Sequence, residues 1–362
     1  FGSSHFGSRR FSARPYPRRY KSNLRYKHTT VAMITYLVFA LGVSVSRACS
    51  HFAMENQFII TVRTEDLSGS PHFVIATKPR GGKGLRTSKL GYVSFVDTNI
   101  RSGMNDAGLM CDKQTLQCTY PHRSPHLDNI DAAFICQWAL EAFGNISELK
   151  AALPGVNFVK PKDPNFQNGH WAFRDAAGRG LVIEFVDGDM QVYDDNNDGG
   201  KTGFGIMTNE PPLPWHVQAV KLLQWKQSLR EPSIDVPGSW YPDARFQRLY
   251  LVKSSMPKPS THEEALMQAV HTLNTVTVPF GAPFFGGYKT QWAAVWDHQN
   301  RTVYWRSHSN QNLQRLRLQD ADLGEGGAER QLMVNSSQLA WFNDVATLLQ
   351  PPSKSSLEEH FM

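Results

Sequence analysis

Ser46-Arg47-Ala48-Cys49-Ser50-His51-Phe52 decides the interpretation of this sequence of 362 residues. A run without charged residues extends from Thr29 to Ser46 and ends in Ser-Arg-Ala. Small residues at positions 46 and 48 fit a signal-peptidase site, which predicts cleavage after Ala48. Cys49 would then be the first residue of the mature protein.

An N-terminal cysteine carries two reactive groups on one residue. Its thiol is a nucleophile, and its α-amine, with an ordinary pKa of roughly 7.7–8.0, can act as the general base. This arrangement is the N-terminal-nucleophile form of base-activated attack. Secreted proteins also often begin near a cysteine that forms a disulfide, so the cleavage site by itself leaves both interpretations of Cys49 open.

Residues 1–48 have the composition of a leader. They contain nine Lys or Arg and no Asp or Glu, and their first methionine is Met33. Either Met33 is the true start of a compact signal peptide, or the basic stretch is a long n-region. An uncleaved signal-anchor is a further alternative, because an apolar run of about 18 residues is at the lower limit for spanning a bilayer. Cleavage predicts a secreted, periplasmic or lumenal protein, with membrane contact only through an uncleaved leader.

The remainder of the chain has the composition of a globular domain. Hydrophobic residues make up 41% and aromatic residues 11% of the sequence, which is enough for a sizeable core. Without residues 1–48, 29 basic side chains stand against 32 acidic ones, a net charge of about −3. The basic balance therefore belongs to the leader and is no evidence for nucleic-acid binding. We expect a single domain over residues 49–350 and a polar tail over 351–362.

Short strands and amphipathic helices alternate along this domain. Apolar runs predict strands, and apolar residues at helical spacing predict helices. Asp187-Gly188 predicts a tight hairpin turn, and Ser260-Thr261-His262-Glu263 predicts a capping box. The expected strands are 58–62, 73–77, 92–96, 181–186, 190–193, 290–297 and 302–306, and the expected helices are 129–153, 215–229 and 260–276.

The sequence contains four cysteines, Cys49, Cys111, Cys118 and Cys136. If Cys49 is the nucleophile, three remain, and an odd number cannot all pair. Cys111 and Cys118 could form a disulfide in an oxidising compartment, and whether they do stays open from the sequence. Cys136 lies in an apolar helical pattern and is expected to be a buried free thiol.

No cofactor or metal ion is predicted. Asp194-Asp195-Asn196-Asn197-Asp198-Gly199 fits the first half of a calcium-binding EF-hand loop, but Gly205 stands where the bidentate glutamate is needed. We interpret this segment as a polar turn. His122 and His126 are four residues apart, but Pro125 between them argues against a helical metal site.

Five segments downstream of Cys49 form a further pattern. Each has a plain structural explanation when taken alone, such as a surface ion pair for Arg63 and Asp66. The segments are Val62-Arg63-Thr64-Glu65-Asp66, Gly103-Met104-Asn105-Asp106-Ala107-Gly108-Leu109, Thr208-Asn209-Glu210-Pro211, the run from Pro237-Gly238 to Arg245-Phe246, and Thr290-Gln291-Trp292. In this order and spacing they resemble the choloylglycine hydrolase family, which includes conjugated bile acid hydrolases and penicillin V acylases among the N-terminal-nucleophile hydrolases.

The resemblance implies a fold and a set of roles. The fold would be a four-layer αββα sandwich of two antiparallel sheets, of the α+β class. Cys49 would be the nucleophile, Arg63 would stabilise its thiolate, and Asp66 would orient its α-amine. Asn209 would donate to the oxyanion, and Arg245 would support the site electrostatically. The implied reaction is hydrolysis of a linear, non-peptide N-acyl amide through a thioester, and the family also suggests a homo-oligomer.

Three questions stay open from the sequence. The substrate could be a conjugated bile acid, penicillin V, an N-acyl homoserine lactone or another small N-acyl amide. The second oxyanion donor could be Gln117 or a backbone amide. If the leader is retained, Cys49 has no basic amine, and the alternative is a secreted or membrane-anchored non-catalytic binding protein on the same fold.

Overall fold

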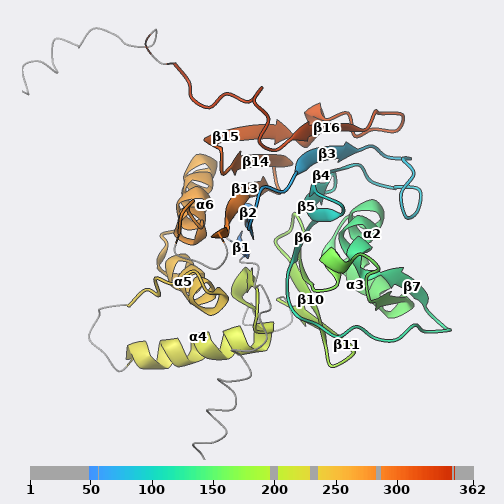
Figure 1. The fold of residues 1–362 in the computed structure, drawn as a ribbon, viewed down its shortest axis with the longest axis horizontal. Coiled ribbons are helices and arrows are strands. Elements are labelled where there is room, and N and C mark those ends of the chain that lie inside the picture. The colour runs from blue at the N-terminus through green and yellow to red at the C-terminus, as the bar shows by residue number, and fades with distance from the viewer. Residues whose placement is uncertain are drawn as a thin grey trace, which may run out of the picture. The chain divides into compact units, whose positions relative to one another are not determined.

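The computed structural model describes residues 49–55, 57–195, 203–228, 235–282, 287–344 and 346. The expected leader and tail lie outside these residues, as does most of the acidic turn that begins at Asp194. The described chain forms two large antiparallel sheets with helices on their outer faces (Figure 1).

The first sheet has the strand order β12-β1-β2-β13-β14-β15, and all its neighbouring strands are antiparallel. Its strands are β1 (Ser50–Glu55), β2 (Ile59–Leu67), β12 (Ile206–Thr208), β13 (Lys289–Asp297), β14 (Thr302–Ser307) and β15 (Asn310–Arg317). The sheet therefore joins the beginning of the domain to its last third.

The second sheet has the strand order β11-β10-β9-β6-β5-β4-β3-β16, also antiparallel. A separate parallel pair is formed by β7 (Asp128–Asp131) and β8 (Val156–Val159). The strands of the second sheet are β3 (Val74–Lys78), β4 (Tyr92–Val96), β5 (Ile100–Asn105), β6 (Met110–Gln114), β9 (His170–Arg174), β10 (Gly180–Val186), β11 (Asp189–Asp194) and β16 (Arg330–Met333).

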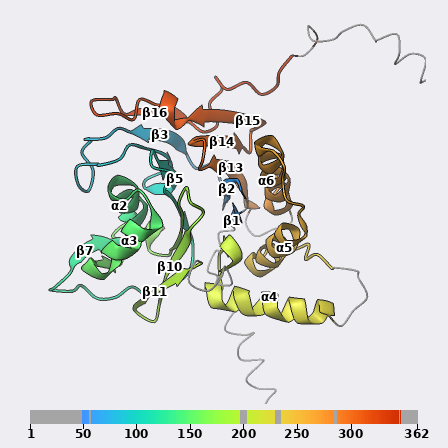
Figure 2. The ribbon, with the colours of Figure 1, turned by 180° about the vertical axis from the view of Figure 1, so that it is seen from behind.

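In the described part of the chain, α-helices cover the outer faces of the two sheets, as Figures 1 and 2 show from opposite sides. The side of the second sheet carries α2 (Ile135–Ala142) and α3 (Ile146–Ala152), and the side of the first carries α4 (Leu213–Ser228), α5 (Pro242–Ser255) and α6 (His262–Val276). Short 3₁₀ turns lie at Ala132–Phe134, Leu153–Gly155, Pro164–Phe166, Gly203–Gly205 and Leu318–Asp320.

Side-chain alternation along β13 explains the layering. Trp292 and Trp296 face the space between the sheets, where Trp292 stacks on Phe95 of β4 with ring centroids 4.4 Å apart. Ala293 and Val295 face the opposite side and join the apolar cluster of α5 and α6. The four-layer αββα sandwich expected from the sequence is confirmed.

Both faces of the central strands are covered, so all nine residues of β2 and all nine of β13 are buried. Polar side chains on β2 consequently cannot reach bulk water. A buried polar group is costly unless it is hydrogen-bonded or paired, so these side chains need partners inside the protein.

The predicted strands and hairpins are confirmed, and so are the helices that correspond to α4 and α6. Thr261 is the N-cap of α6, and Glu264 rather than Glu263 completes the capping box. The predicted helix 129–153 is wrong at its start and at its middle. Its first residues form β7, and Asn145 starts a new helix because its side chain accepts a hydrogen bond from the Glu148 N–H.

The candidate pairing of Cys111 with Cys118 is wrong. The disulfide joins Cys111 to Cys136, with their Cα atoms 5.4 Å apart, and Cys118 is a half-buried free thiol. The apolar face of α2 that carries Cys136 packs on the face of β6 that carries Cys111. The helical pattern placed Cys136 on a buried face correctly, but sequence alone did not show which strand that face would cover.

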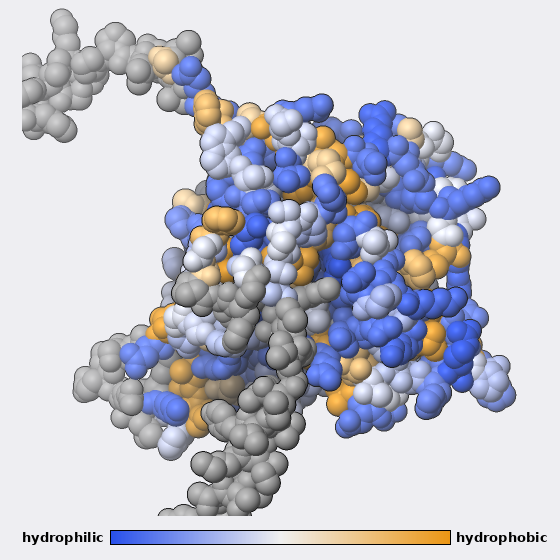
Figure 3. Space-filling view, viewed as in Figure 1, coloured by the Kyte–Doolittle hydropathy of each residue, from blue (hydrophilic) through white to orange (hydrophobic). Residues whose placement is uncertain are grey.

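On the face seen in Figure 3, the visible hydrophobic residues of the described chain lie in patches among hydrophilic ones. On α4, Trp215, Leu222 and Trp225 are exposed. Among the described residues, no helix is both long enough and apolar enough to cross a membrane.

Replacing Cys136 with serine should lower the free energy of unfolding by about 3 kcal/mol, since the disulfide restricts an unfolded-chain loop of 25 residues. Denaturant unfolding measures this loss. Cys118→Ser is the control and should change stability little, because Cys118 is not in a disulfide. Peptide mapping that finds Cys111 joined to Cys118 would contradict the pairing.

Candidate active site

Three strands and one helix bring the five predicted site residues together. In the register of β1 with β2, Ser50 pairs with Thr64, so Cys49 lies beside the end of β2 that bears Arg63 and Asp66. On the other side, Ser50 pairs with Thr208 of β12, which places Asn209 next to Cys49. The fifth residue, Arg245, enters from α5 and is fully buried.

The side-chain amide of Asn209 connects the main chain of Cys49 to two other segments. Its Oδ1 accepts hydrogen bonds from Cys49 N at 2.6 Å and from Arg245 Nη2 at 3.0 Å. Its Nδ2 donates to Thr115 O at 2.8 Å. Because a side-chain amide has two N–H donors and no other described residue accepts from Nδ2, one N–H is available to a further acceptor.

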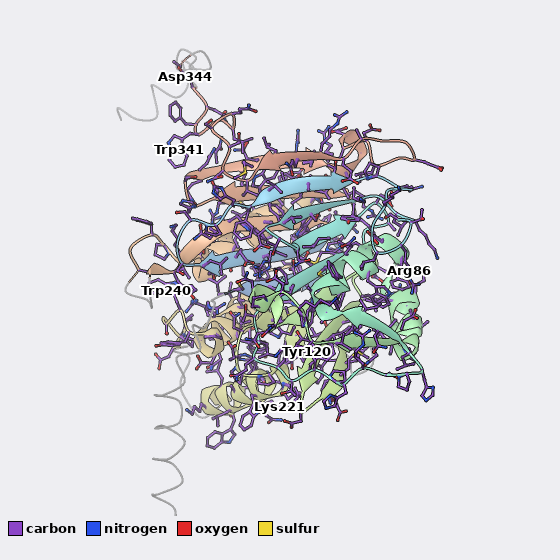
Figure 4. The ribbon with its side chains drawn as sticks, turned by 45° about the vertical axis from the view of Figure 1, so that its right-hand side comes forward. Arg86, Tyr120, Lys221, Trp240, Trp341 and Asp344 are labelled. Carbon is purple, nitrogen blue, oxygen red and sulfur yellow. A yellow bond between two sulfur atoms is a disulfide. The ribbon has the colours of Figure 1, made fainter. Side chains whose placement is uncertain are left out.

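Arg245 binds the carbonyl oxygen of Cys49. Its Nη1 donates to Cys49 O and to Ser50 Oγ, the latter at 2.6 Å. Its Nε donates to Trp240 O at 2.9 Å, on the loop that leads into α5 (Figure 4). Burial lowers the pKa of Arg245 to about 10, and the nearby Asp66 and Cys49 oppose this shift, so the guanidinium stays cationic at neutral pH.

Arg63 lies against the thiol of Cys49. It hydrogen-bonds the sulfur, donates to Glu65 and to Thr64 O, and donates to Lys113 O at 2.9 Å. Burial alone would lower the pKa of this guanidinium, but the charges of Cys49 and Glu65 raise it above the ordinary value. Arg63 is therefore a permanent positive charge beside the sulfur.

Asp66 lies among two hydroxyl groups and two arginines. Thr290 Oγ1 donates to its Oδ1 at 2.5 Å, and Thr64 Oγ1 donates to its Oδ2 at 3.2 Å. Burial raises the pKa of Asp66 to about 7, although Arg245, Thr290 and Arg63 each favour the ionised form. In the peptide-bonded chain this carboxyl is thus poised between its two protonation states near neutral pH.

The environment of the Cys49 thiol combines opposing effects. Burial raises the thiol pKa above its ordinary value, and the carboxylates of Glu65 and Asp66 add to the increase. Arg63 and the backbone N–H of Asp66 lower it, but the net shift is upward. While Cys49 is joined to Ala48 by a peptide bond, the thiol form is favoured, and another positive charge close to the sulfur would favour the thiolate.

A second buried pair lies behind Arg63. His51 is the cross-strand partner of Arg63, and its Nδ1 is 2.6 Å from Asp112 Oδ2 on β6. Asp112 Oδ1 is 4.0 Å from Arg63 Nε. All three side chains are almost completely buried, so β6 of the second sheet takes part in holding the arginine of the first.

Several residues of this site were not identified in the sequence. Ser50, Glu65 and Thr115 contact the predicted residues directly, as described above, and Thr290 holds Asp66. Thr290 was visible only as part of the Thr-Gln-Trp segment, without a role. Gln117, one of the two candidates for the second oxyanion donor, has an exposed side chain, and its backbone N–H donates to Glu210 Oε1 at 3.1 Å.

No cluster of three or more His, Cys, Asp or Glu side chains that could hold a metal ion occurs within the described ranges. The two described aspartates of the calcium-like segment take part in ion pairs. Asp194 pairs with Lys150 at 2.5 Å, and Asp195 pairs with Arg174 at 2.9 Å.

Comparisons with known proteins identify the family of this chain. The sequence model of the linear amide C–N hydrolases, choloylglycine hydrolase family, matches residues 52–340. The chain is 24% identical over 266 residues to a bile salt hydrolase/transferase of Clostridium perfringens, covering 66% of this chain and 77% of the relative. It is also 24% identical over 371 aligned positions to a penicillin V acylase of Pectobacterium atrosepticum, covering 90% and 96%.

A solved structure shows the same fold. A variant of conjugated bile acid hydrolase from Clostridium perfringens superposes with a TM-score of 0.69 at 22% identity, covering 79% of this chain and 97% of that chain. Two antiparallel sheets between helical layers, with a cysteine at the start of a central strand, define the N-terminal-nucleophile hydrolase fold. The chain belongs to the choloylglycine hydrolase family. It is a hydrolase that acts on carbon–nitrogen bonds other than peptide bonds.

Arg63→Gln should raise the pKa of the Cys49 thiol further, because the positive charge that favours the thiolate is lost. Iodoacetamide alkylation of Cys49, followed by mass spectrometry from pH 6 to 10, gives this pKa. The matched control is Arg248→Gln on α5, whose Nε donates to Thr275 O at 2.8 Å. An unchanged alkylation profile for Arg63→Gln would show that Arg63 does not stabilise the thiolate.

Proposed function

We propose that cleavage after Ala48 releases Cys49 as an N-terminal residue whose thiolate hydrolyses a linear N-acyl amide. The observation that carries this proposal is the way the main chain of Cys49 is held. Its nitrogen donates to Asn209 Oδ1 at 2.6 Å, and its carbonyl oxygen accepts from Arg245. Any buried backbone N–H needs an acceptor, but here both contacts to the main chain of Cys49 come from predicted site residues, which supports an α-amine fixed beside its own thiol.

The proposed reaction begins with proton transfer from the Cys49 thiol to its α-amine. The thiolate attacks the substrate carbonyl carbon. The resulting oxyanion accepts a hydrogen bond from the second side-chain N–H of Asn209. The tetrahedral intermediate expels the amine, which takes the proton from the α-ammonium, and leaves a thioester on Cys49. Water, deprotonated by the α-amine, then attacks the thioester and releases the carboxylic acid and the thiol.

Cleavage also changes the charge balance of the site. A peptide N–H becomes an amine that is cationic when protonated, on the same residue as the thiol and next to Asn209 Oδ1. A nearby positive charge favours the ionised forms of Cys49 and Asp66, so both pKa values should fall relative to the peptide-bonded chain. Asp66 is then an anion that holds the α-ammonium, and Arg63 stabilises the thiolate.

The substrate class follows from the shared chemistry of the two relatives. Their names specify a bile salt and penicillin V, both of which contain an acyl group joined to nitrogen by a carboxamide. We therefore propose that the substrate of this protein is also a small-molecule N-acyl amide. The proposal does not specify the acyl group. The buried Cys111–Cys136 disulfide, together with the leader pattern, supports a secreted, periplasmic or lumenal location.

The second candidate concerns a form of the protein that keeps its leader, which would act as a non-catalytic binding protein. The raised pKa of the Cys49 thiol while the peptide bond to Ala48 is intact favours this role for the uncleaved form, because a thiol without a base is a poor nucleophile. The two candidates differ in whether the leader is removed.

The protein secreted by a secretion-competent host should begin at Cys49, and Edman sequencing or intact mass checks this. Cys49→Ser should reduce turnover of N-acyl amides by about 10³-fold or more, because the hydroxyl is a weaker nucleophile at neutral pH. Cys118→Ser should retain activity. A chain that starts upstream of Cys49 would favour the binding protein, and turnover that survives Cys49→Ser would refute the mechanism.

Asn209→Ala should reduce kcat by about 10²- to 10³-fold, since an oxyanion donor acts mainly on the transition state. Steady-state kinetics on the best substrate of an N-acyl amide screen measure the effect. Asn157→Ala is the control, because the Asn157 amide is also largely buried and donates to His122 O at 2.8 Å, away from Cys49. Equal losses of kcat in both variants would show that Asn209 is not a specific donor to the oxyanion.

A further inference from the structure

His216 lies on the first turn of α4, immediately after the segment that carries Asn209. Its side chain is 2% exposed, and its Nε2 is 3.0 Å from the carbonyl oxygen of Asn209. A carbonyl oxygen only accepts hydrogen bonds, so Nε2 must carry the hydrogen and donate it. His216 Nδ1 is then the unprotonated nitrogen, and no described residue donates to it.

The imidazole ring is also fixed by stacking. His216 lies parallel to Phe246, with ring centroids 4.7 Å apart and an interplanar angle of 8°. Phe246 directly follows Arg245 on α5, and Thr208, directly before Asn209, donates through its hydroxyl to Pro242 O at 2.9 Å. One ring therefore contacts the segment that carries Asn209 and the helix that carries Arg245.

The helix that carries His216 is anchored at its start. The N–H of Leu213 lies 3.1 Å from both carboxylate oxygens of Glu184 on β10, and Glu184 is fully buried. His170 Nδ1 is 3.0 Å from the same carboxylate. A carboxylate at a helix N-terminus satisfies a free N–H and interacts favourably with the helix dipole, so the first turn of α4 is held against the second sheet.

We propose that His216 is a positioning residue for Asn209: its Nε2–H fixes the Asn209 backbone so that the free side-chain N–H points at the carbonyl attacked by Cys49. This role rests on the proposed function of Asn209. His216 does not touch the reacting atoms itself. A lost hydrogen bond to the Asn209 carbonyl leaves that oxygen buried without a partner, and the segment then shifts to satisfy it.

The ring is suited to this role because it is neutral. Burial lowers the pKa of His216 to about 4, with His170 and Arg245 lowering it further and Asn209 O and Asp243 opposing them. A neutral ring donates to the carbonyl without adding a second cation next to Arg245. The interaction is therefore unchanged through the neutral pH range.

His298 supplies a matched control. It is completely buried, burial lowers its pKa to about 4, and its Nδ1 is 3.0 Å from the backbone carbonyl oxygen of Gly108. Its other nitrogen, Nε2, lies 2.9 Å from Thr61 Oγ1. His298 thus has the same burial and the same type of contact as His216, but in a turn that carries no proposed catalytic residue.

The experiment compares His216→Leu, His216→Gln and His298→Leu in the mature protein. Each is assayed for kcat and KM on an N-acyl amide and for iodoacetamide alkylation of Cys49, which requires the thiolate but no oxyanion donor. His216→Leu should lower kcat about 10-fold, the usual effect of one lost hydrogen bond, with KM and alkylation unchanged. Glutamine keeps an N–H donor and should restore most of kcat, and His298→Leu should lower thermal stability without lowering kcat.

Three results would overturn the inference: an unchanged kcat in His216→Leu, an equal loss of kcat in His298→Leu, or a parallel loss of alkylation. If the wild-type protein alkylates at Cys49 but hydrolyses no N-acyl amide, the proposed function fails instead. A crystal structure of His216→Leu then decides the positioning role. If the variant keeps the hydrogen bond from Cys49 N to Asn209 Oδ1 and the one from Asn209 Nδ2 to Thr115 O, the positioning role is refuted. Loss of these hydrogen bonds would support the role.

Discussion

Charge buried on the two faces of the first sheet is the constraint on which this structure depends. Arg63 and Asp66 occupy a strand that is covered on both faces, and Arg245 is equally inaccessible to water. Ions in such a place are tolerated only when they are paired and their remaining hydrogen-bonding atoms are satisfied. The contacts of Glu65, Thr290, Ser50 and Trp240 supply these partners, so residues with no direct chemical role are still required for the site to exist.

The same constraint links maturation to chemistry. In the peptide-bonded chain, the site holds a thiol whose pKa is raised and an aspartic acid with a pKa of about 7. Both shifts arise mainly from burial, and both oppose the charged forms that the proposed mechanism uses. An α-ammonium formed by cleavage after Ala48 would be an additional cation on the same residue as the thiol, next to Asn209 Oδ1. Proteolysis would then complete the electrostatics of the site as well as expose its base.

The fold was predictable from the resemblance to the family, and the five predicted side chains lie together in the structure, because the segments that carry them have a recognisable order and spacing. Arg63 and Asp66 are three residues apart at a strand end, and Asn209 precedes a proline in a recognisable turn. Their contacts were not predictable, because they depend on strand register: Thr290 reaches Asp66 only through the pairing of β13 with β2. The disulfide was mispredicted for a related reason, since Cys136 lies 25 residues from its partner and meets it only when α2 packs on β6.

Strand β6 shows how one element can serve stability and chemistry at the same time. Alternation turns Cys111 outward to the disulfide with α2 and turns its neighbour Asp112 inward to His51 and Arg63. A displacement of β6 along its own axis would therefore move the carboxylate behind Arg63, even though the disulfide lies on the opposite face of the sheet. The disulfide fixes the position of β6 relative to α2, while the antiparallel pairing with β5 and β9 fixes its register. The outer helical layer thus contributes to the position of Arg63 through a covalent bond that has no contact with the thiol of Cys49.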